Sequence, residues 1–360
     1  MQQYSPNLFF AGAATAFFTI NALNFLLKKD RTRLQTILGW ILAVWAVLNL
    51  KDIITAFPAF QTKEWANNIL FIDCWSTVTY IIFIFELSKP RWTTWRKVAA
   101  LIAPFAVFTL IYAFWKNYYV LNSYIVFVWI CAFTFFTIGF FLVKDYSQYI
   151  RNNYSNIDEI DISWLKSFYL FAIIEQSLYF VLCINYNIFL DIAYYASAIS
   201  MWQIAIHYSN LLRPIPMVEP NVSLNTEEEE NHTYTFAGTI EKLVEERELY
   251  LNKDIMLSDL AKSVGTNRTY LSDYFCNVKH TTFYDYINQL RIEQMAIPLI
   301  QQHPEYTLEF IASESGFKSI STFRRAFAKF VGKSPSSYRN ELENKKNVDS
   351  VSHDTLPTDI

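Results

Sequence analysis

The fold of the C-terminal third is decided by residues 257–265, LSDLAKSVG, whose pattern returns at residues 308–316 as LEFIASESG. Both copies begin with leucine, continue with an apolar residue followed by alanine, and end on glycine. An amphipathic segment follows each copy, LSDYF at 271–275 and FRRAF at 323–327. A short helix, a turn containing glycine and a second helix are typical of the helix-turn-helix motif. The sequence therefore predicts two such units.

The turn and cap residues of the two units agree with this prediction. Gly265 and Gly316 are expected to adopt a left-handed backbone, which would strain a residue that carries a Cβ atom. Residue types that cap helix N-termini stand at all four expected helix starts. They are Ser258 and Thr307 for the first helix of each unit, and Asn267 and Ser319 for the second.

The same region resembles the C-terminal DNA-binding domain of the AraC/XylS family of bacterial transcription regulators. Three runs carry the resemblance: GTNRTYLSDYF at 265–275, FYDYINQLRIEQM at 283–295 and GFKSISTFRRAFAKFVGKSPSSYR at 316–339. It covers roughly residues 240–340, under a third of the chain. It implies that one long helix joins the two units, and that each unit inserts a recognition helix into successive major grooves of DNA.

Composition separates this region from the rest of the 360-residue chain, which is long enough for two or three domains. Apolar residues make up 52% of the sequence and gather before residue 213, whereas charge gathers after it. The four cysteines show no CxxC or Cys/His ligand spacing, so neither a zinc site nor a disulfide framework is expected. The seven glycines form no phosphate-binding loop. We therefore expect no cofactor.

Seven apolar stretches precede Arg213, each near the ~20 residues that a membrane-spanning helix needs. Together they predict an all-α chain, with a seven-helix transmembrane domain at 1–212 ahead of the DNA-binding domain. The stretches run approximately over 7–27, 34–57, 66–87, 98–115, 120–143, 165–185 and 190–212.

Lysine and arginine are concentrated in alternate loops, which sets the expected orientation because cytoplasmic loops carry the excess of these residues. The N-terminus is then outside, and everything after the seventh span is cytoplasmic, where DNA is. We therefore expect a multi-pass protein of the cytoplasmic (inner) membrane. The cations are Lys28, Lys29, Arg31 and Arg33 in the first loop, Lys89, Arg91, Arg96 and Lys97 in the third, and Lys144 and Arg151 in the fifth; the second loop has Lys63, the fourth Lys116, and the N-terminal tail and the sixth loop none.

The cytoplasmic part divides into three segments. Residues 213–232 are rich in Pro, Asn and Glu and predict a linker, since such a composition cannot bury a core. The DNA-binding domain is expected at 233–340, opening with a helix over 239–251. Pro298 should kink or end the connecting helix, because proline lacks the N–H and clashes with the preceding turn. A disordered tail is expected at 341–360.

The second unit carries the stronger signal for DNA binding. Residues 315–340 contain six basic residues and no acidic one, a pattern typical of a phosphate-binding surface, although a merely solvated face would look the same. Phe323 and Phe327 are core by spacing. The resemblance places Ser321 and Arg325 toward the groove, which favours an Arg325–guanine contact. The full set of candidates here is Lys318, Ser319, Ile320, Ser321, Thr322, Arg324, Arg325, Lys329 and Lys333, and Arg339 completes the basic set.

The first unit is expected to contribute less. The resemblance places Arg268, Thr269, Ser272 and Asp273 toward DNA. Asp273 stands where the family usually has a basic residue, and a carboxylate there would repel phosphate unless it accepts from a cytosine amine. His280 also stands in place of the family's usual glycine.

Charged residues inside the apolar stretches are candidates for sensing, because burying charge in a membrane is costly and often functional. They could line an outward-facing pocket for a small polar ligand. The favoured alternative is that Lys51 with Asp52 or Asp73 forms an interhelical ion pair that holds the bundle together. Catalysis is not expected, since His207 is the only histidine among the spans. The candidates are Lys51, Asp52, Asp73, Glu175 and Asp191.

The sequence thus predicts a membrane-bound AraC-type regulator that binds double-stranded DNA from the cytoplasmic face, as a homodimer. Its membrane domain would contact lipid and sense a small-molecule or protein signal. The alternative is a seven-span receptor whose C-terminal domain binds a protein partner instead of DNA. A transporter is disfavoured, since no pair of Gly/Pro-broken helices recurs in two halves.

Overall fold

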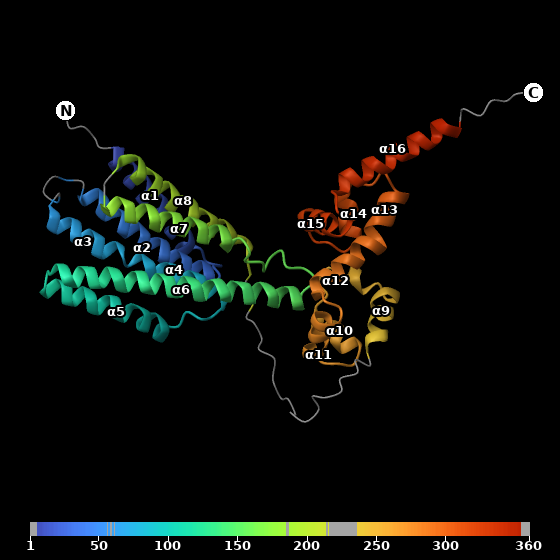
Figure 1. Cartoon of the computed structure of the whole chain (residues 1–360), viewed down its shortest axis with the longest axis horizontal. Helices are drawn as coiled ribbons and strands as arrows, with labels where there is room; N and C mark the ends of the chain where they lie inside the picture. The colour runs from blue at the N-terminus through green and yellow to red at the C-terminus, as the bar shows by residue number, and fades with distance from the viewer. Residues whose placement is uncertain are drawn as a thin grey trace, which may run out of the picture. The chain divides into compact units, whose positions relative to one another are not determined.

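The structure, a computed structural model, is helical and divides into two compact units, shown in Figure 1. Unit 1 comprises residues 1–147 and 159–217, and unit 2 comprises residues 148–158 and 218–360. No β-strand occurs among the residues that the structure describes, which confirms the predicted all-α class. Those residues are 6–55, 57, 60, 62–184, 187–213, 215 and 236–353.

Unit 1 is built from long apolar helices, and within the described residues six segments of it are long and apolar enough to cross a membrane. Every predicted span coincides with a helix, and the third is broken into two at Cys74 and Trp75. Helix α7 fills the sixth predicted span, but it is not one of the six apolar segments. The helices are α1 (Pro6–Leu27), α2 (Arg33–Thr55), α3 (Lys63–Asp73), α4 (Ser76–Ser88), α5 (Trp95–Phe114), α6 (Tyr118–Asn153), α7 (Leu165–Ile184) and α8 (Ile188–Leu211).

Aromatic rings fill the interior of unit 1. The rings of Trp45 and Trp202 lie 5.7 Å apart, and Tyr80 stacks on Trp202 at 5.8 Å. Phe83 and Phe168 close the same cluster. Rings in this separation range add favourable edge and stacking contacts to the burial of their area. Large apolar side chains also lie on the outside of the bundle, as expected for a surface that faces lipid.

Helix α6 is longer than predicted. The apolar stretch suggested an end near residue 143, but the helix has 36 residues and continues to Asn153. At 1.5 Å per residue that is about 54 Å, well beyond the ~30 Å hydrocarbon thickness. Its residues from Gln148 onward belong to unit 2. One helix therefore starts in unit 1 and ends in unit 2.

Unit 2 contains the two predicted helix-turn-helix units, α10 with α11 and α14 with α15, each around its own apolar core. The predicted helix over 239–251 ends earlier, at Glu246, and a 3₁₀ turn follows. The elements are α9 (Ala237–Glu246), η2 (Leu249–Leu251), α10 (Leu257–Ser263), α11 (Arg268–Asp273), η3 (Tyr274–Val278), α12 (Phe283–Leu290), η4 (Arg291–Ala296), α13 (Ile297–Gln302), α14 (Leu308–Glu314), α15 (Ile320–Val331) and α16 (Pro335–His353).

Pro298 does not end the connecting helix. Instead the six residues 291–296 widen into a π-helical turn directly before it, and α13 continues beyond with Pro298 in its first turn. A proline is tolerated there, because its missing N–H has no helical partner to lose. At the expected interruption the helix widens locally into the π-helical turn. Helices α12, η4 and α13 follow one another directly and connect the two helix-turn-helix units.

Three of the four predicted caps are confirmed. The side chains of Asn267, Thr307 and Ser319 each accept a hydrogen bond from a backbone N–H in the first turn of their helix. Ser258 was a wrong prediction. Helix α10 begins at Leu257, so its N-cap residue is Met256 and Ser258 lies inside the helix. There the Asp259 carboxylate accepts from the N–H of Met256 at 3.1 Å.

Both turn glycines adopt the predicted left-handed backbone, with φ of +72° at Gly265 and +83° at Gly316. At Gly316 a Cβ atom would also lie 2.8 Å from the carbonyl oxygen of Leu251. Gly316 of the second helix-turn-helix unit is therefore required by both its backbone conformation and the close approach of Leu251. Gly265 of the first is required by its backbone conformation alone.

The predicted disordered tail is helical over much of its length, since α16 runs to His353. Residues 354–360 lie outside the described residues, as does the predicted linker apart from residues 213 and 215.

Candidate nucleic-acid interface

Helix α15 presents a basic face. Phe323 and Phe327 are fully buried, as predicted, and Ser321, Arg324 and Arg325 are exposed on the opposite side. This separation follows from the amphipathic spacing of the helix, since residues three and four apart share a face. Thr322 departs from the expectation of an open groove-facing position, because its exposed fraction is only 3%.

The basic side chains around α15 are matched by carboxylates of the same unit. Lys329 lies 2.7 Å from Asp285, and Arg324 lies 3.9 Å from Glu309. Most of these cations are about half exposed, so each ion pair is weak in water. Another anion can therefore replace the carboxylate. The remaining pairs are Lys318 with Asp254, Arg325 with Asp158 and Lys333 with Glu341.

Arg339 differs from the other cations of the basic set. Its guanidinium donates to the backbone carbonyl of Tyr306 at 2.8 Å. This contact ties α16 to the start of the second unit, so Arg339 has a structural partner.

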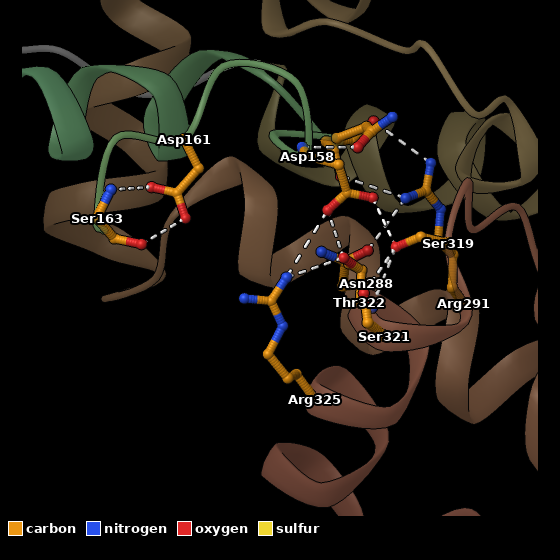
Figure 2. Close-up of polar contacts among 11 residues, drawn as sticks. Asp158, Asp161, Ser163, Asn288, Arg291, Ser319, Ser321, Thr322 and Arg325 are labelled. Atoms are coloured by element: carbon orange, nitrogen blue, oxygen red, sulfur yellow. Dashed lines mark hydrogen bonds and ion pairs between the residues drawn. The ribbon is translucent and has the colours of Figure 1, made fainter. Parts of the chain in front are cut away.

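The N-terminus of α15 holds a carboxylate that comes from far along the chain (Figure 2). Ser319 Oγ donates to Asp158 at 2.7 Å and also accepts from the N–H of Thr322 at 3.2 Å. The hydroxyl of Thr322 donates to the other carboxylate oxygen, and Arg325 lies 3.7 Å from it. Four features that favour an anion meet here: two hydroxyls, a guanidinium and the positive end of a helix dipole.

Arg291 occupies the junction between the two helix-turn-helix units. It is 1% exposed and donates to the carbonyls of Tyr250 and Asn252 at 2.6 and 2.8 Å. Its guanidinium also lies 5.5 Å from the ring centroid of Phe317 and donates to Ser155. Burial lowers the pKa of Arg291 to about 10, so the side chain still carries its charge at neutral pH.

The first unit is arranged differently from the second. Arg268 lies 5.9 Å from the ring of Tyr149 and donates to its hydroxyl at 3.4 Å. Thr269 is exposed, Ser272 is half-buried, and Asp273 accepts from Asn277 at 2.5 Å within the same helical stretch. A single arginine thus represents the positive charge of this recognition helix, and a carboxylate lies close to it.

His280 takes the backbone conformation that the family's glycine would take, with φ of +49°. The corresponding position after α15 is Gly332, at φ +80°. His280 is therefore a strained residue in the first helix-turn-helix unit.

The polar sensing candidates of unit 1 are brought together in part. Lys51 pairs with Asp52 and lies 2.8 Å from Asp73. Tyr179 donates to Asp73 at 3.1 Å, and Tyr195 donates to Asp52 at 3.2 Å. This arrangement favours the ion-pair interpretation of these three residues over the open-pocket one.

The other two sensing candidates are Glu175 and Asp191. Glu175 is buried and accepts from Tyr80, and Asp191 is half-buried in the first turn of α8. No group of three or more metal-ligating side chains occurs in the described part of the chain. The absence of catalysis and of a cofactor stays a prediction.

Asp158 and Arg291 were not predicted as functional residues. Asp158 is 161 positions from Ser319 along the chain, and nothing in the local sequence indicates their contact. Arg291 lies in the FYDYINQLRI run, where the amphipathic pattern alone does not show that a charged side chain is buried.

The geometry of unit 2 agrees with what known proteins show. Residues 260–341 match a family model described as a helix-turn-helix domain. Over 111 residues the chain is 31% identical to an uncharacterised HTH-type transcriptional regulator of Staphylococcus aureus (strain COL), which is 30% of this chain and 15% of that protein. Over 118 residues it is 26% identical to the Msm operon regulatory protein of Streptococcus mutans, 33% of this chain and 41% of that protein.

The matched region is therefore less than half of either relative, and it falls in the C-terminal part of this chain. No solved structure matches the chain. The chain carries a C-terminal AraC-type helix-turn-helix domain behind a set of apolar, potentially membrane-spanning helices.

Proposed function

Since residues 260–341 form an AraC-type helix-turn-helix domain, we propose that the protein is a membrane-bound transcription regulator that binds promoter DNA from the cytoplasmic face. The observation that carries the proposal is the exposed basic face of α15, opposite its buried Phe323 and Phe327. A recognition helix must fit a groove on one side and pack on its own domain on the other.

Within this proposal the side chains divide into two roles. Arg325 and Ser321 read base edges from α15, and Lys318, Arg324, Lys329 and Lys333 bind phosphates around it. The carboxylate partners of Lys318, Arg324 and Lys333 are exposed, so a DNA phosphate can replace them, whereas Asp158 and Asp285 are more buried. Arg268, Thr269 and Ser272 add a weaker second contact from α11. Asp273 limits that contact through its negative charge.

The membrane placement is supported by the apolar helices and by the loop charges. Six segments reach the length and apolarity of a span, and α7 lies where a further span was predicted. Seven crossings put unit 2 on the side where Lys and Arg are concentrated, which is the cytoplasm. The membrane domain would then sense a signal and shift the population of DNA-binding conformations. Two copies on one promoter would give the homodimer.

The test uses the full chain in lipid nanodiscs. A random duplex library is selected for binding, and the recovered sequence is footprinted at two salt concentrations. We expect two protected patches about one helical turn apart, weakened by salt and lost in Arg324→Ala/Arg325→Ala. Binding that neither salt nor the double substitution weakens would contradict the proposal and favour the alternative, a receptor whose C-terminal domain binds a protein partner.

A further inference from the structure

Residues 148–158 consist of the last turns of α6 and the start of the loop after it. They pack onto the face of unit 2 that the proposed function assigns to DNA. This segment belongs to unit 2 although it lies before α7 and α8 in the sequence. Ser155 and Ile157 are buried in this unit, with exposed fractions of 1% and 3%. Burial of this degree shows that the segment is an integral part of the domain surface.

Two backbone contacts and one side chain hold the middle of the segment. The N–H of Ser155 donates to the carbonyl of Ile255 at 3.3 Å, and Tyr154 forms an antiparallel bridge with Met256. The guanidinium of Arg291 donates to both the carbonyl and the hydroxyl of Ser155, each at 3.3 Å. The segment is thereby fastened to the connecting helix and to the start of the first unit.

Both recognition helices are engaged by the same segment. Near its start, Tyr149 accepts from Arg268 of α11 and presents its ring to that guanidinium. At its end, Asp158 occupies the N-terminus of α15, where it binds Ser319, Thr322 and Arg325 (Figure 2). Arg268 and Arg325, one proposed DNA-facing arginine from each helix-turn-helix unit, thus contact one stretch of the chain.

The chemistry at Asp158 is that of a phosphate contact. Hydroxyl groups, an arginine and a helix N-terminus are the groups that proteins use to bind DNA phosphate oxygens. A carboxylate presents two oxygens and a negative charge to the same donors. Since one set of donors cannot hold both anions, Asp158 and a DNA phosphate would compete.

From this placement we propose that residues 148–158 form an autoinhibitory segment, in which Asp158 stands in for a DNA phosphate and must leave before α15 enters the groove. The inference rests on the proposed function. Its structural consequence is a direct link between sensing and DNA binding, since the segment continues α6 without a break in the helix up to Asn153. A change in α6 that withdraws the segment would free both recognition helices together.

The chain offers a matched control. Asp161 lies three residues after Asp158, and within the described residues its carboxylate accepts from the N–H and hydroxyl of Ser163, at 2.9 and 2.8 Å (Figure 2). Asp161→Asn therefore removes the same charge from the same loop without touching α15. Any general effect of the loop charge on DNA appears in both variants.

The experiment measures binding of a 40-base-pair random-sequence duplex to the full chain in nanodiscs at low salt, by fluorescence anisotropy. Asp158→Asn should tighten binding about tenfold, a coupling within the range that linked sites show, and Asp161→Asn should not change it. In an Arg325→Ala background the gain from Asp158→Asn should shrink, because the competing phosphate contact is missing. An Asp158→Asn affinity equal to or weaker than that of Asp161→Asn would overturn the inference.

A second readout separates this inference from the proposed function. Amide hydrogen exchange of residues 154–158 is followed in the wild-type chain before and after DNA is added. Faster exchange with DNA supports displacement of the segment, and unchanged or slower exchange overturns it. If the chain binds DNA, and Arg325→Ala weakens this binding while Asp158→Asn leaves it unchanged, only the autoinhibition inference fails. If no variant binds DNA, the proposed function fails, and autoinhibition of DNA binding fails with it.

Discussion

The guanidinium of Arg291 donates a 2.6 Å hydrogen bond to the carbonyl oxygen of Tyr250, and so ties the connecting helix to the entrance of the first helix-turn-helix unit. It contacts the ring of Phe317, at the turn of the second unit, from the same position. One buried side chain therefore contacts both helix-turn-helix units at the point where they are joined.

Replacing Arg291 by methionine should destabilise unit 2 by about 2–4 kcal/mol, because the buried carbonyls of Tyr250 and Asn252 lose their donor. The measurement is the free energy of opening from native-state hydrogen exchange of α12 amides in the full chain. Arg291→Lys keeps the charge but offers one ammonium group in place of a fork, and it should recover only part of the loss. Unchanged protection in Arg291→Met would contradict the assigned role.

The two turn glycines should respond differently to alanine. Gly265→Ala meets no atom within 4 Å and should cost only the left-handed backbone strain, ~1–2 kcal/mol. Gly316→Ala also brings a Cβ atom to 2.8 Å from the carbonyl oxygen of Leu251, and should cost about 1–3 kcal/mol more. Hydrogen exchange of α10 and α14 compares the two variants. Equal losses would show that Leu251 moves aside freely.

His280→Gly should stabilise the first unit by about 1 kcal/mol, because the left-handed backbone at φ +49° strains a residue with a Cβ atom. Gly332→Ala, at the corresponding position after α15, should have the opposite effect. Hydrogen exchange of the amides in α11 and α12 reports the first change. A loss of protection in His280→Gly would mean that the imidazole makes a contact worth more than the strain.

Asp273→Ala should leave DNA affinity unchanged or raise it, since the carboxylate lies on the recognition helix of the first unit and repels phosphate. Its bond to Asn277 lies within one helical turn, so little structure depends on it. The measurement is anisotropy with duplex DNA at two salt concentrations. Weaker binding by Asp273→Ala would show that the carboxylate accepts from a base.

Lys51→Met should lower the thermal stability of the membrane domain strongly, since Asp52 and Asp73 would be left without their cation. The triple variant Lys51→Met/Asp52→Asn/Asp73→Asn should recover much of the loss, because no uncompensated charge remains. Melting of the detergent-solubilised chain, followed by tryptophan fluorescence, compares them. A stable single variant that no longer responds to its signal would instead favour a ligand pocket.

Much of the architecture was predictable because its causes are local. The paired patterns at 257–265 and 308–316, the turn glycines and the caps at Asn267, Thr307 and Ser319 act on the backbone within a few residues. Apolar stretches near the length of a span likewise predict helices wherever they occur. The misplaced cap at Ser258 shows the limit, since the start of a helix depends on which neighbouring carboxylate reaches the first N–H.

The candidate site was predictable only as a set of residues on α15. Amphipathic spacing put Phe323 and Phe327 inside and Arg324 and Arg325 outside. It did not show that Thr322 is buried, because the carboxylate that contacts Thr322 comes from the loop after α6.

By itself the sequence determined two helix-turn-helix units, their basic face and the apolar helices before them, since periodicity, turn residues and hydropathy are properties of neighbouring residues. Only the tertiary structure decided that Asp158 binds at the N-terminus of α15. It also decided that Arg291 donates hydrogen bonds to the carbonyls of Tyr250, Asn252 and Ser155. Those contacts join positions 39 to 161 residues apart. They form because folding brings the donors to one place, and no local pattern records which acceptor will meet them.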